Sequence, residues 1–113
     1  MASDKEFVLF VADQFENCGE ITSRAMFGEY GIYADGKLFG LICDNKLFIK
    51  PTQAGRAYIE NLVEAPPYPG AKNSFLIGDK IEDRSWLSEL ARITLEELPE
   101  PRKKKKQNNL KNR

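Results

Sequence analysis

The residues that could carry acid–base or nucleophilic chemistry are few in this 113-residue chain, and they are far apart. Histidine is absent, which removes the commonest general base and the commonest ligand of transition metals. The two cysteines, Cys18 and Cys43, are 25 positions apart and form no CxxC motif. In a reducing compartment we expect two free thiols, with Cys43 acting as a small buried apolar residue.

Polar side chains gather between positions 24 and 44, where the chain has Arg24, Tyr30, Tyr33, Asp35 and Asp44. Tight turns account for both aspartates, and strand propensity accounts for both tyrosines. The sequence has no nucleophile elbow, no phosphate-binding loop and no paired carboxylates. We therefore predict a protein that is not an enzyme and needs no cofactor or metal, with a small enzyme as the least favoured alternative.

Arg24 is the residue of this group that is hardest to explain by structure alone. By strand alternation, its side chain points to the same side as that of Met26. Two roles stay open: an ion pair with an acid such as Glu29, or a bond that fixes the Phe27-Gly28 turn or a partner's carboxylate. The structural role is the favoured one.

The segments that position these residues are short strands joined by tight turns. Asp35-Gly36 and Asp44-Asn45 suit two-residue β-hairpin loops, because their residues tolerate φ > 0. The sequence therefore predicts an antiparallel meander, with strands over residues 21–27, 28–34, 37–43 and 46–50. A further, edge-placed strand is expected over residues 74–77, after a proline-rich loop at 65–70.

The strand predicted over residues 37–43 is apolar on both faces. Its alternating sets are Phe39, Leu41 and Cys43 on one face, and Leu38, Gly40 and Ile42 on the other. A sheet with one face in water would alternate apolar with polar residues, so we expect a helix or another subunit to cover the second face. Because Leu9 and Phe10 also lie off the apolar stripe of the first helix, we predict a homodimer.

Helices are expected at both ends of the chain and in its middle. Ser3 and Glu6 have the S-x-x-E spacing of a capping box, so the first helix should begin at Ser3 or Asp4 and end before Gly19. The second should begin near residues 51–53 and the third should span residues 82–98. The predicted fold class is α+β, two-layer, with a mainly antiparallel curved sheet, packed helices and the order α-β-β-β-β-α-β-α.

Opposite charges divide the chain into two parts. Residues 1–98 form one predicted domain with a net charge of −6, whereas residues 99–113 form a basic tail with a net charge of +6 that we expect to be disordered. The tail could contact nucleic acid without reading bases, act as a solubility tail, or fold back on the acidic body. Its candidate contacts are Arg102, Lys103, Lys104, Lys105 and Lys106.

A motif runs through the meander, with residues Arg24, Met26, Phe27, Gly28, Gly31, Tyr33 and Gly36, followed by Phe39 and Lys50. This motif resembles the N-terminal domain of the TfoX (Sxy) family, over roughly residues 4–98. Glu29 departs from the family, which usually has a second glycine there. The 113 residues also lack the helical C-terminal domain of full-length competence regulators, so functions of that domain are not carried over.

The resemblance implies a bacterial α+β domain that acts in the control of DNA-uptake competence. We predict a cytoplasmic regulatory or protein-interaction module, with no apolar run long enough to span a membrane and no secretory signal pattern. Its partner would be a protein of transcription regulation. The alternative is a nucleic-acid-associated accessory protein that binds non-specifically through the tail. The candidate interaction residues are Arg24, Met26, Phe27, Gly28, Gly31, Tyr33 and Gly36.

Overall fold

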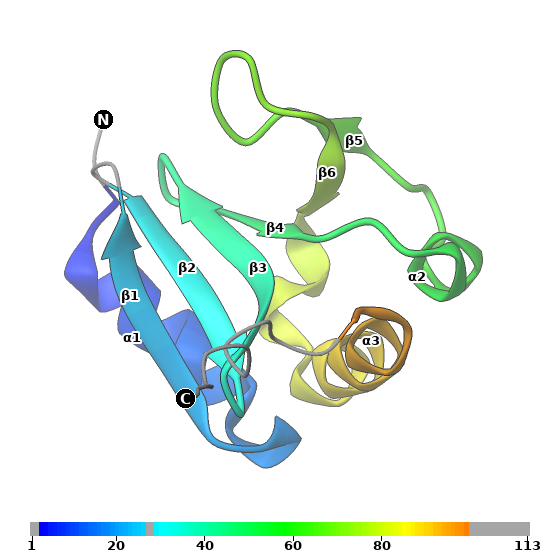
Figure 1. Cartoon of the computed structure of the whole chain (residues 1–113), viewed down its shortest axis with the longest axis horizontal. Coiled ribbons are helices and arrows are strands. Elements are labelled where there is room, and N and C mark those ends of the chain that lie inside the picture. The colour runs from blue at the N-terminus through cyan, green and yellow to red at the C-terminus, as the bar shows by residue number, and fades with distance from the viewer. Residues whose placement is uncertain (1–2, 27–28, 100–113) are drawn as a thin grey trace, which may run out of the picture.

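The computed structural model of the protein describes residues 3–26 and 29–99, which form a six-stranded antiparallel sheet with helices packed on it (Figure 1). The strand order is β1-β2-β3-β4-β6-β5. The first four strands are the predicted meander, and they are β1 (Ile21–Met26), β2 (Glu29–Ala34), β3 (Lys37–Cys43) and β4 (Lys46–Ile49). The α+β prediction and the order of its elements are confirmed.

Four central residues with positive φ form the two hairpin turns of the meander, as predicted: Asp35 (50°), Gly36 (84°), Asp44 (54°) and Asn45 (57°). These short polar residues and glycine adopt the left-handed region at little cost. The twist of such turns matches the twist of the strands that they join, and the meander is therefore encoded locally.

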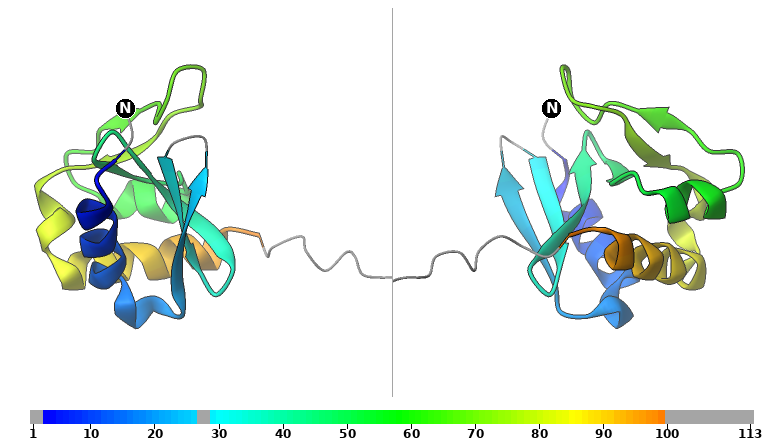
Figure 2. Two further views of the ribbon diagram at one scale, coloured as in Figure 1. Left: turned by 90° about the vertical axis from the view of Figure 1, so that its left-hand side faces the viewer. Right: turned by 45° about the vertical axis from the view of Figure 1, so that its right-hand side comes forward.

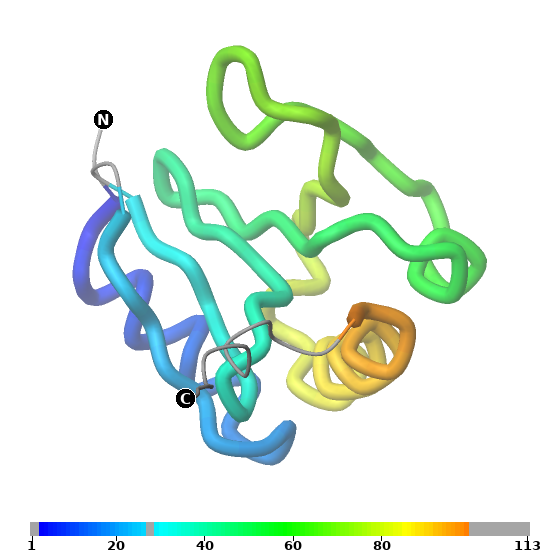
Figure 3. Tube along the Cα trace, viewed as in Figure 1, coloured from blue at the N-terminus to red at the C-terminus, as the bar shows by residue number. Residues whose placement is uncertain are grey.

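The strand β6 (Ser74–Ile77) is not at the edge, contrary to the prediction. It pairs with β4 on one side and with β5 (Glu64–Ala65) on the other. Because β5 has only two residues and is followed by two prolines, no strand pattern marks it in the sequence. The proline-rich loop at residues 66–73 joins these two strands and projects from them in the Cα trace (Figure 3).

The helices start at polar caps or short turns. They are α1 (Lys5–Gln14), α2 (Gln53–Tyr58) and α3 (Arg84–Glu97), with 3-10 turns at Glu16–Cys18 and Asp79–Glu82. Thr52 caps α2 by accepting a hydrogen bond from the Gly55 amide (2.9 Å), and Asp83 caps α3 by accepting one from the Trp86 amide (3.0 Å). Among the described residues, none of the helices is long and apolar enough to cross a bilayer.

The capping box predicted for α1 is absent. Asp4 is the N-cap, and its side chain makes no capping hydrogen bond. The Ser3 hydroxyl donates instead to Glu29 Oε1 (2.7 Å) and accepts from the Asn45 amide (3.0 Å). The distant carboxylate of Glu29 thus takes the place that the sequence assigned to Glu6.

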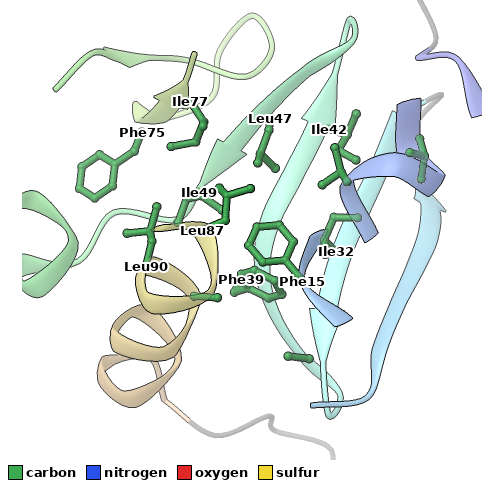
Figure 4. Packing of buried hydrophobic residues seen from close by; sticks show 14 residues of the cluster. Phe15, Ile32, Phe39, Ile42, Leu47, Ile49, Phe75, Ile77, Leu87 and Leu90 are labelled. Atoms are coloured by element: carbon green, nitrogen blue, oxygen red, sulfur yellow. The ribbon is translucent and has the colours of Figure 1, made fainter. Parts of the chain in front are cut away.

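The core lies between the sheet and the pair α1 and α3 (Figure 4). Phe15, just after α1, contacts Phe39 of β3 edge-to-face, with ring centroids 5.1 Å apart. Leu87 and Leu90 of α3 complete the contact with the sheet and are fully buried. The strands contribute Ile32, Ile42, Leu47, Ile49, Phe75 and Ile77.

A β-bulge decides which side chains enter this core. The register of β2 against β3 shifts between Ile32 and Tyr33, so that Ile32 lies opposite Gly40 whereas Tyr33 lies opposite Leu38. Phe39 and Ile42 are therefore both fully buried in the core. The predicted grouping of Phe39 with Leu41 and Cys43 is wrong, because alternation by two fails across the extra residue.

Candidate functional site

The face of the sheet turned away from the core, here called the outer face, gathers most of the motif. Directly opposed residues of an antiparallel pair project to the same face. Arg24 of β1 lies opposite Gly31 of β2, which in turn lies opposite Leu41 of β3. Tyr33 lies opposite Leu38, and Met26 shares the face with Arg24 by alternation.

Gly31 leaves space for the side chains of its neighbours on the outer face. A Cβ at this position would lie 2.9 Å from Met26 Sδ and 3.0 Å from Leu38 Cδ1, closer than such atoms can approach. Its role is thus to let Met26 and Leu38 close over the middle of β2.

These residues border a hollow of about 690 Å³ on the outer face, the outer-face hollow. Its lining is mostly apolar and comprises Met26, Leu38, Leu41, Cys43, Tyr30 and Tyr68, with Glu29 and Lys50. Tyr68 comes from the proline-rich loop, which therefore forms one wall of the hollow. A helix or another subunit was expected to cover the second face of the sheet, but this loop covers part of it instead, and Tyr68 is still 55% exposed.

Lys50 connects the outer-face hollow to two smaller ones. It lines a hollow of about 330 Å³ with Pro67 and Lys72, and another of about 250 Å³ with Tyr33 and Pro99. The three hollows follow one another around this half-buried side chain. Lys50 is thus the residue that all three hollows share.

Two cations of the outer face, Arg24 and Lys50, have no acidic partner among the residues that the structure describes. The Arg24 guanidinium lies 5.7 Å from the ring centroid of Tyr33, in a cation–π contact worth about 0.5–1 kcal/mol at an exposed site. Within residues 3–26 and 29–99, neither Arg24 nor Lys50 forms an ion pair. Their charges remain available to a ligand.

Glu29 adds an acid to the hollow, but its carboxylate is already bound. Oε1 accepts from the Ser3 amide (3.1 Å) and the Ser3 hydroxyl (2.7 Å), and Oε2 accepts from the Asp44 amide (3.1 Å). These three donors, from Ser3 before α1 and from Asp44 in the β3–β4 turn, stabilise the charged carboxylate. The ion pair between Arg24 and Glu29 considered from the sequence does not form.

The remaining predicted residues are placed less centrally or lie outside the described part of the chain. Gly36 is in the β2–β3 turn and lines the smallest of the three hollows with Tyr33. Phe27 and Gly28 lie outside the described residues. So do the candidate nucleic-acid contacts Arg102, Lys103, Lys104, Lys105 and Lys106.

Sequence reasoning missed the site residues that depend on tertiary contacts. Tyr68 lies in the segment predicted to be a proline-rich loop. No local sequence pattern connects that loop to the sheet. Leu38 and Leu41 reach one face through the bulge. Lys50 is the last residue of the motif. No acidic residue lies within two positions of it in the sequence, and this was the available signal that its charge could be unpaired.

Both cysteines are free thiols with weakened nucleophilicity. Burial raises the pKa of Cys43, and the nearby Glu29 carboxylate raises it further. Burial also raises the pKa of Cys18, opposed in part by a hydrogen bond with the Ser88 side chain. Within the described residues, no three potential metal ligands of the His, Cys, Asp or Glu type form a group.

The TfoX N-terminal domain family matches residues 13–98, which include all six strands, α2 and α3. The chain belongs to the TfoX N-terminal domain family. A related protein of Spirochaeta aurantia, described as an uncharacterized 12.7 kDa protein in the trpE 5′ region, is 40% identical over 105 residues. The alignment covers 93% of this chain and 91% of that protein. In this TfoX N-terminal domain the motif residues Arg24, Met26, Gly31 and Tyr33 thus share the outer face.

Proposed function

We propose that this protein is a cytoplasmic, non-enzymatic regulatory module that binds a partner protein on the outer face of its sheet, in the control of transcription or competence. Membership of the TfoX N-terminal domain family supports the regulatory part of the proposal. The outer face supports the binding part, because it combines an apolar floor with cations that are not used by the fold.

The observation that carries the proposal is the placement of the motif residues. Side chains needed only for folding belong to the core, yet Arg24 is exposed and Met26 and Tyr33 are half-buried on the opposite face. The large hollow next to them has apolar side chains as most of its lining. Apolar contact area with a few placed charges is the usual composition of a binding site.

Charge indicates the chemistry of the partner. Within the described part of the chain Arg24 and Lys50 form no ion pair, and the carboxylate of Glu29 is bound by three donors of the protein. An acidic group that reaches Lys50, followed by an apolar side chain in the outer-face hollow, would complement this surface. We therefore propose an acidic partner segment that carries at least one large apolar residue.

The test is an affinity pull-down from the native cell extract with matched variants. Arg24→Glu and Lys50→Glu reverse the charge at the hollow, whereas Lys5→Glu makes the same change on α1, on the other side of the sheet. We expect both outer-face variants to lose a protein that the parent and Lys5→Glu retain. Equal recovery by all four proteins would reject the outer face as the binding site.

A second function is favoured by the place where the described chain ends. Pro99 lines the same hollow as Lys50 and Tyr33, so the basic tail begins beside the Lys50 side chain. Non-specific nucleic-acid binding through the tail would therefore add to the outer-face charge. Nuclease treatment of the extract separates the two functions, because a protein partner survives it and a partner held through nucleic acid does not.

A further inference from the structure

The strand β1 forms a long free edge of the sheet. It is the first strand in the order β1-β2-β3-β4-β6-β5, and it has six residues, whereas β5 at the other edge has two. In the right-hand view of Figure 2, β1 is at the margin of the sheet, as it is in Figure 1. Unpaired backbone groups at such an edge are a template for another strand.

The hydrogen-bond ladder shows which groups of β1 are free. The Asp35 amide donates to the Glu20 carbonyl (2.9 Å). Glu20 and Asp35 continue the register of the β1–β2 ladder by one residue, so they form a hydrogen-bonded pair of that ladder. Hydrogen-bonded and non-hydrogen-bonded pairs alternate along an antiparallel ladder. The amide and carbonyl groups of Ile21, Ser23 and Ala25 therefore point away from β2.

Among the described residues, the charged Arg24 is the one protective device on this edge. Four consecutive residues, from Thr22 to Ala25, are exposed. The pairing of β1 with β2 runs without a bulge, and the strand contains no proline and no lysine. Proteins usually blunt long edge strands with these devices. The edge of β1 is thus open to a partner strand.

We propose that the partner at this edge is a second copy of the chain, whose β1 pairs antiparallel with the first around a two-fold axis at Ser23. This self-pairing is independent of the protein partner proposed above. It places Ile21 opposite Ala25 of the partner subunit, and Ser23 opposite Ser23 of the partner subunit. The free groups of β1 are symmetric about Ser23, so every one of them meets a free group of the other copy.

Charge selects this register over its neighbours. With the axis at Ser23, Arg24 faces Thr22 of the partner subunit. A shift of the axis to Arg24 would place two guanidinium groups directly opposite each other, and like charges in that position destabilise a sheet. A shift to Thr22 would leave the groups of Ala25 unpaired. Only the axis at Ser23 pairs every free amide and carbonyl group of β1 without placing the two Arg24 side chains directly opposite each other.

Pairing of this kind joins the two outer faces into one surface. The two copies of Arg24 become diagonal neighbours on it, with Cα atoms about 7–8 Å apart. Each guanidinium stays over its own Tyr33 ring, and the pair repels moderately in the free dimer. Replacement of Arg24 by glutamine should therefore strengthen dimerisation at low ionic strength, and the gain should vanish at high salt.

Disulfide trapping tests the register directly. In a Cys18→Ser, Cys43→Ala background, copies with Thr22→Cys and copies with Arg24→Cys are oxidised alone and as a mixture. Non-hydrogen-bonded neighbours lie about 4.5 Å apart between Cα atoms, within disulfide range. We expect cross-linked dimers from the mixture and few from either variant alone. Equal cross-linking of all three samples, or none, would overturn the proposed register.

Sedimentation of the full chain tests the edge itself. The parent should dimerise as its concentration rises to hundreds of micromolar. Ser23→Pro removes a backbone amide that points away from β2 and leaves all hydrogen bonds to β2 in place, so it should weaken dimerisation at least tenfold. The control Thr22→Val keeps every backbone amide and carbonyl group, so it should dimerise as the parent does. A monomeric parent, or a Ser23→Pro dimer as strong as the parent, would overturn the proposal. If Ser23→Pro does not fold, the cross-linking outcome decides.

Discussion

The Glu97 carboxylate, in the last turn of α3, accepts a hydrogen bond from the backbone amide of Gln53 (2.9 Å) at the start of α2. Its other oxygen accepts from the Ala54 amide (3.0 Å). One side chain thus satisfies two amides that a helix N-terminus leaves unpaired. These two bonds lower the pKa of Glu97 and tie the short helix α2 to α3.

Glu97 should make stability depend on pH in the acid range. Because its pKa is lower in the folded protein, its contribution is present above the unfolded value, about 4.3, and is lost as pH falls through the folded value. We expect Glu97→Gln to lower Tm at neutral pH, and we expect this difference to shrink as pH falls below the unfolded value of about 4.3 and to vanish below the folded value. Thermal unfolding across pH checks this, with exposed Glu60→Gln as the control. A difference that grows toward low pH would contradict the assignment.

Gly31 should tolerate alanine better than valine. The atoms nearest to an added Cβ, Met26 Sδ and Leu38 Cδ1, are the ends of flexible side chains and can move. We expect Gly31→Ala to cost less than about 1 kcal/mol and Gly31→Val about 1–3 kcal/mol, from overpacking. Arg24→Ala, at an exposed position, should change stability by about 0.5 kcal/mol or less. Denaturant unfolding gives the order, and a parent-like midpoint for Gly31→Val would reject the packing role.

Tyr68 should control access to Cys43. Both line the outer-face hollow, and Cys43 is only 4% exposed. Removal of this wall by Tyr68→Ala should raise the rate at which a thiol reagent modifies Cys43 several-fold, without a comparable loss of stability. Mass spectrometry of the labelled protein locates the site. Val63→Ala, at a similarly exposed position away from the hollow, is the control, and equal rates for the two variants would contradict the role of Tyr68.

The sequence predicts well those features that depend on neighbouring residues. The turns at Asp35-Gly36 and Asp44-Asn45 have the expected positive φ, because glycine and short polar residues fix that conformation within two positions. The helical spacing of Leu87 and Leu90 in α3 is likewise a local pattern, and both side chains are buried. For these elements, local preference and tertiary packing favour the same structure.

The features that were missed depend on contacts between distant residues. Ser3 was assigned to a helix cap by spacing, but Glu29, 26 positions away, provides a stronger anionic acceptor. The bulge at Phe39 separates this residue from Leu41 and Cys43, with which alternation had grouped it, since alternation has no signal for an inserted residue. Tyr68 reaches the candidate site only because its loop folds toward the sheet. The sequence therefore identified part of the candidate site, namely the motif residues that lie on β1 and β2.

The basic tail should be dispensable for folding. At the end of α3, the Lys37 ammonium donates to the carbonyl oxygens of Leu95 (3.0 Å) and Leu98 (3.2 Å), so the helix C-terminus is held by the body of the protein. A chain cut after Pro99 keeps both bonds. We expect it to unfold at nearly the same denaturant concentration as the full chain, and a large loss of stability would show that the tail packs on the body.

The same cut should abolish any non-specific binding to nucleic acid. Residues 1–98 carry a net charge of −6, whereas the tail carries +6. If most tail cations contact phosphates of duplex DNA, log affinity should fall against log salt with a slope of about −0.9 per contact, roughly −4 to −6 in total. A change of DNA sequence should have little effect, since charge alone reads no bases.

A salt titration with fluorescent duplex DNA measures both quantities for the intact and the truncated chain. Lys50→Gln in the intact chain is an informative companion, because Lys50 lies beside Pro99 where the tail begins. Loss of one phosphate contact there would reduce the slope by about one, while removal of the tail would eliminate binding. Equal affinity of the intact and truncated chains, or binding that is independent of salt, would reject the tail as a nucleic-acid contact and favour its role in solubility.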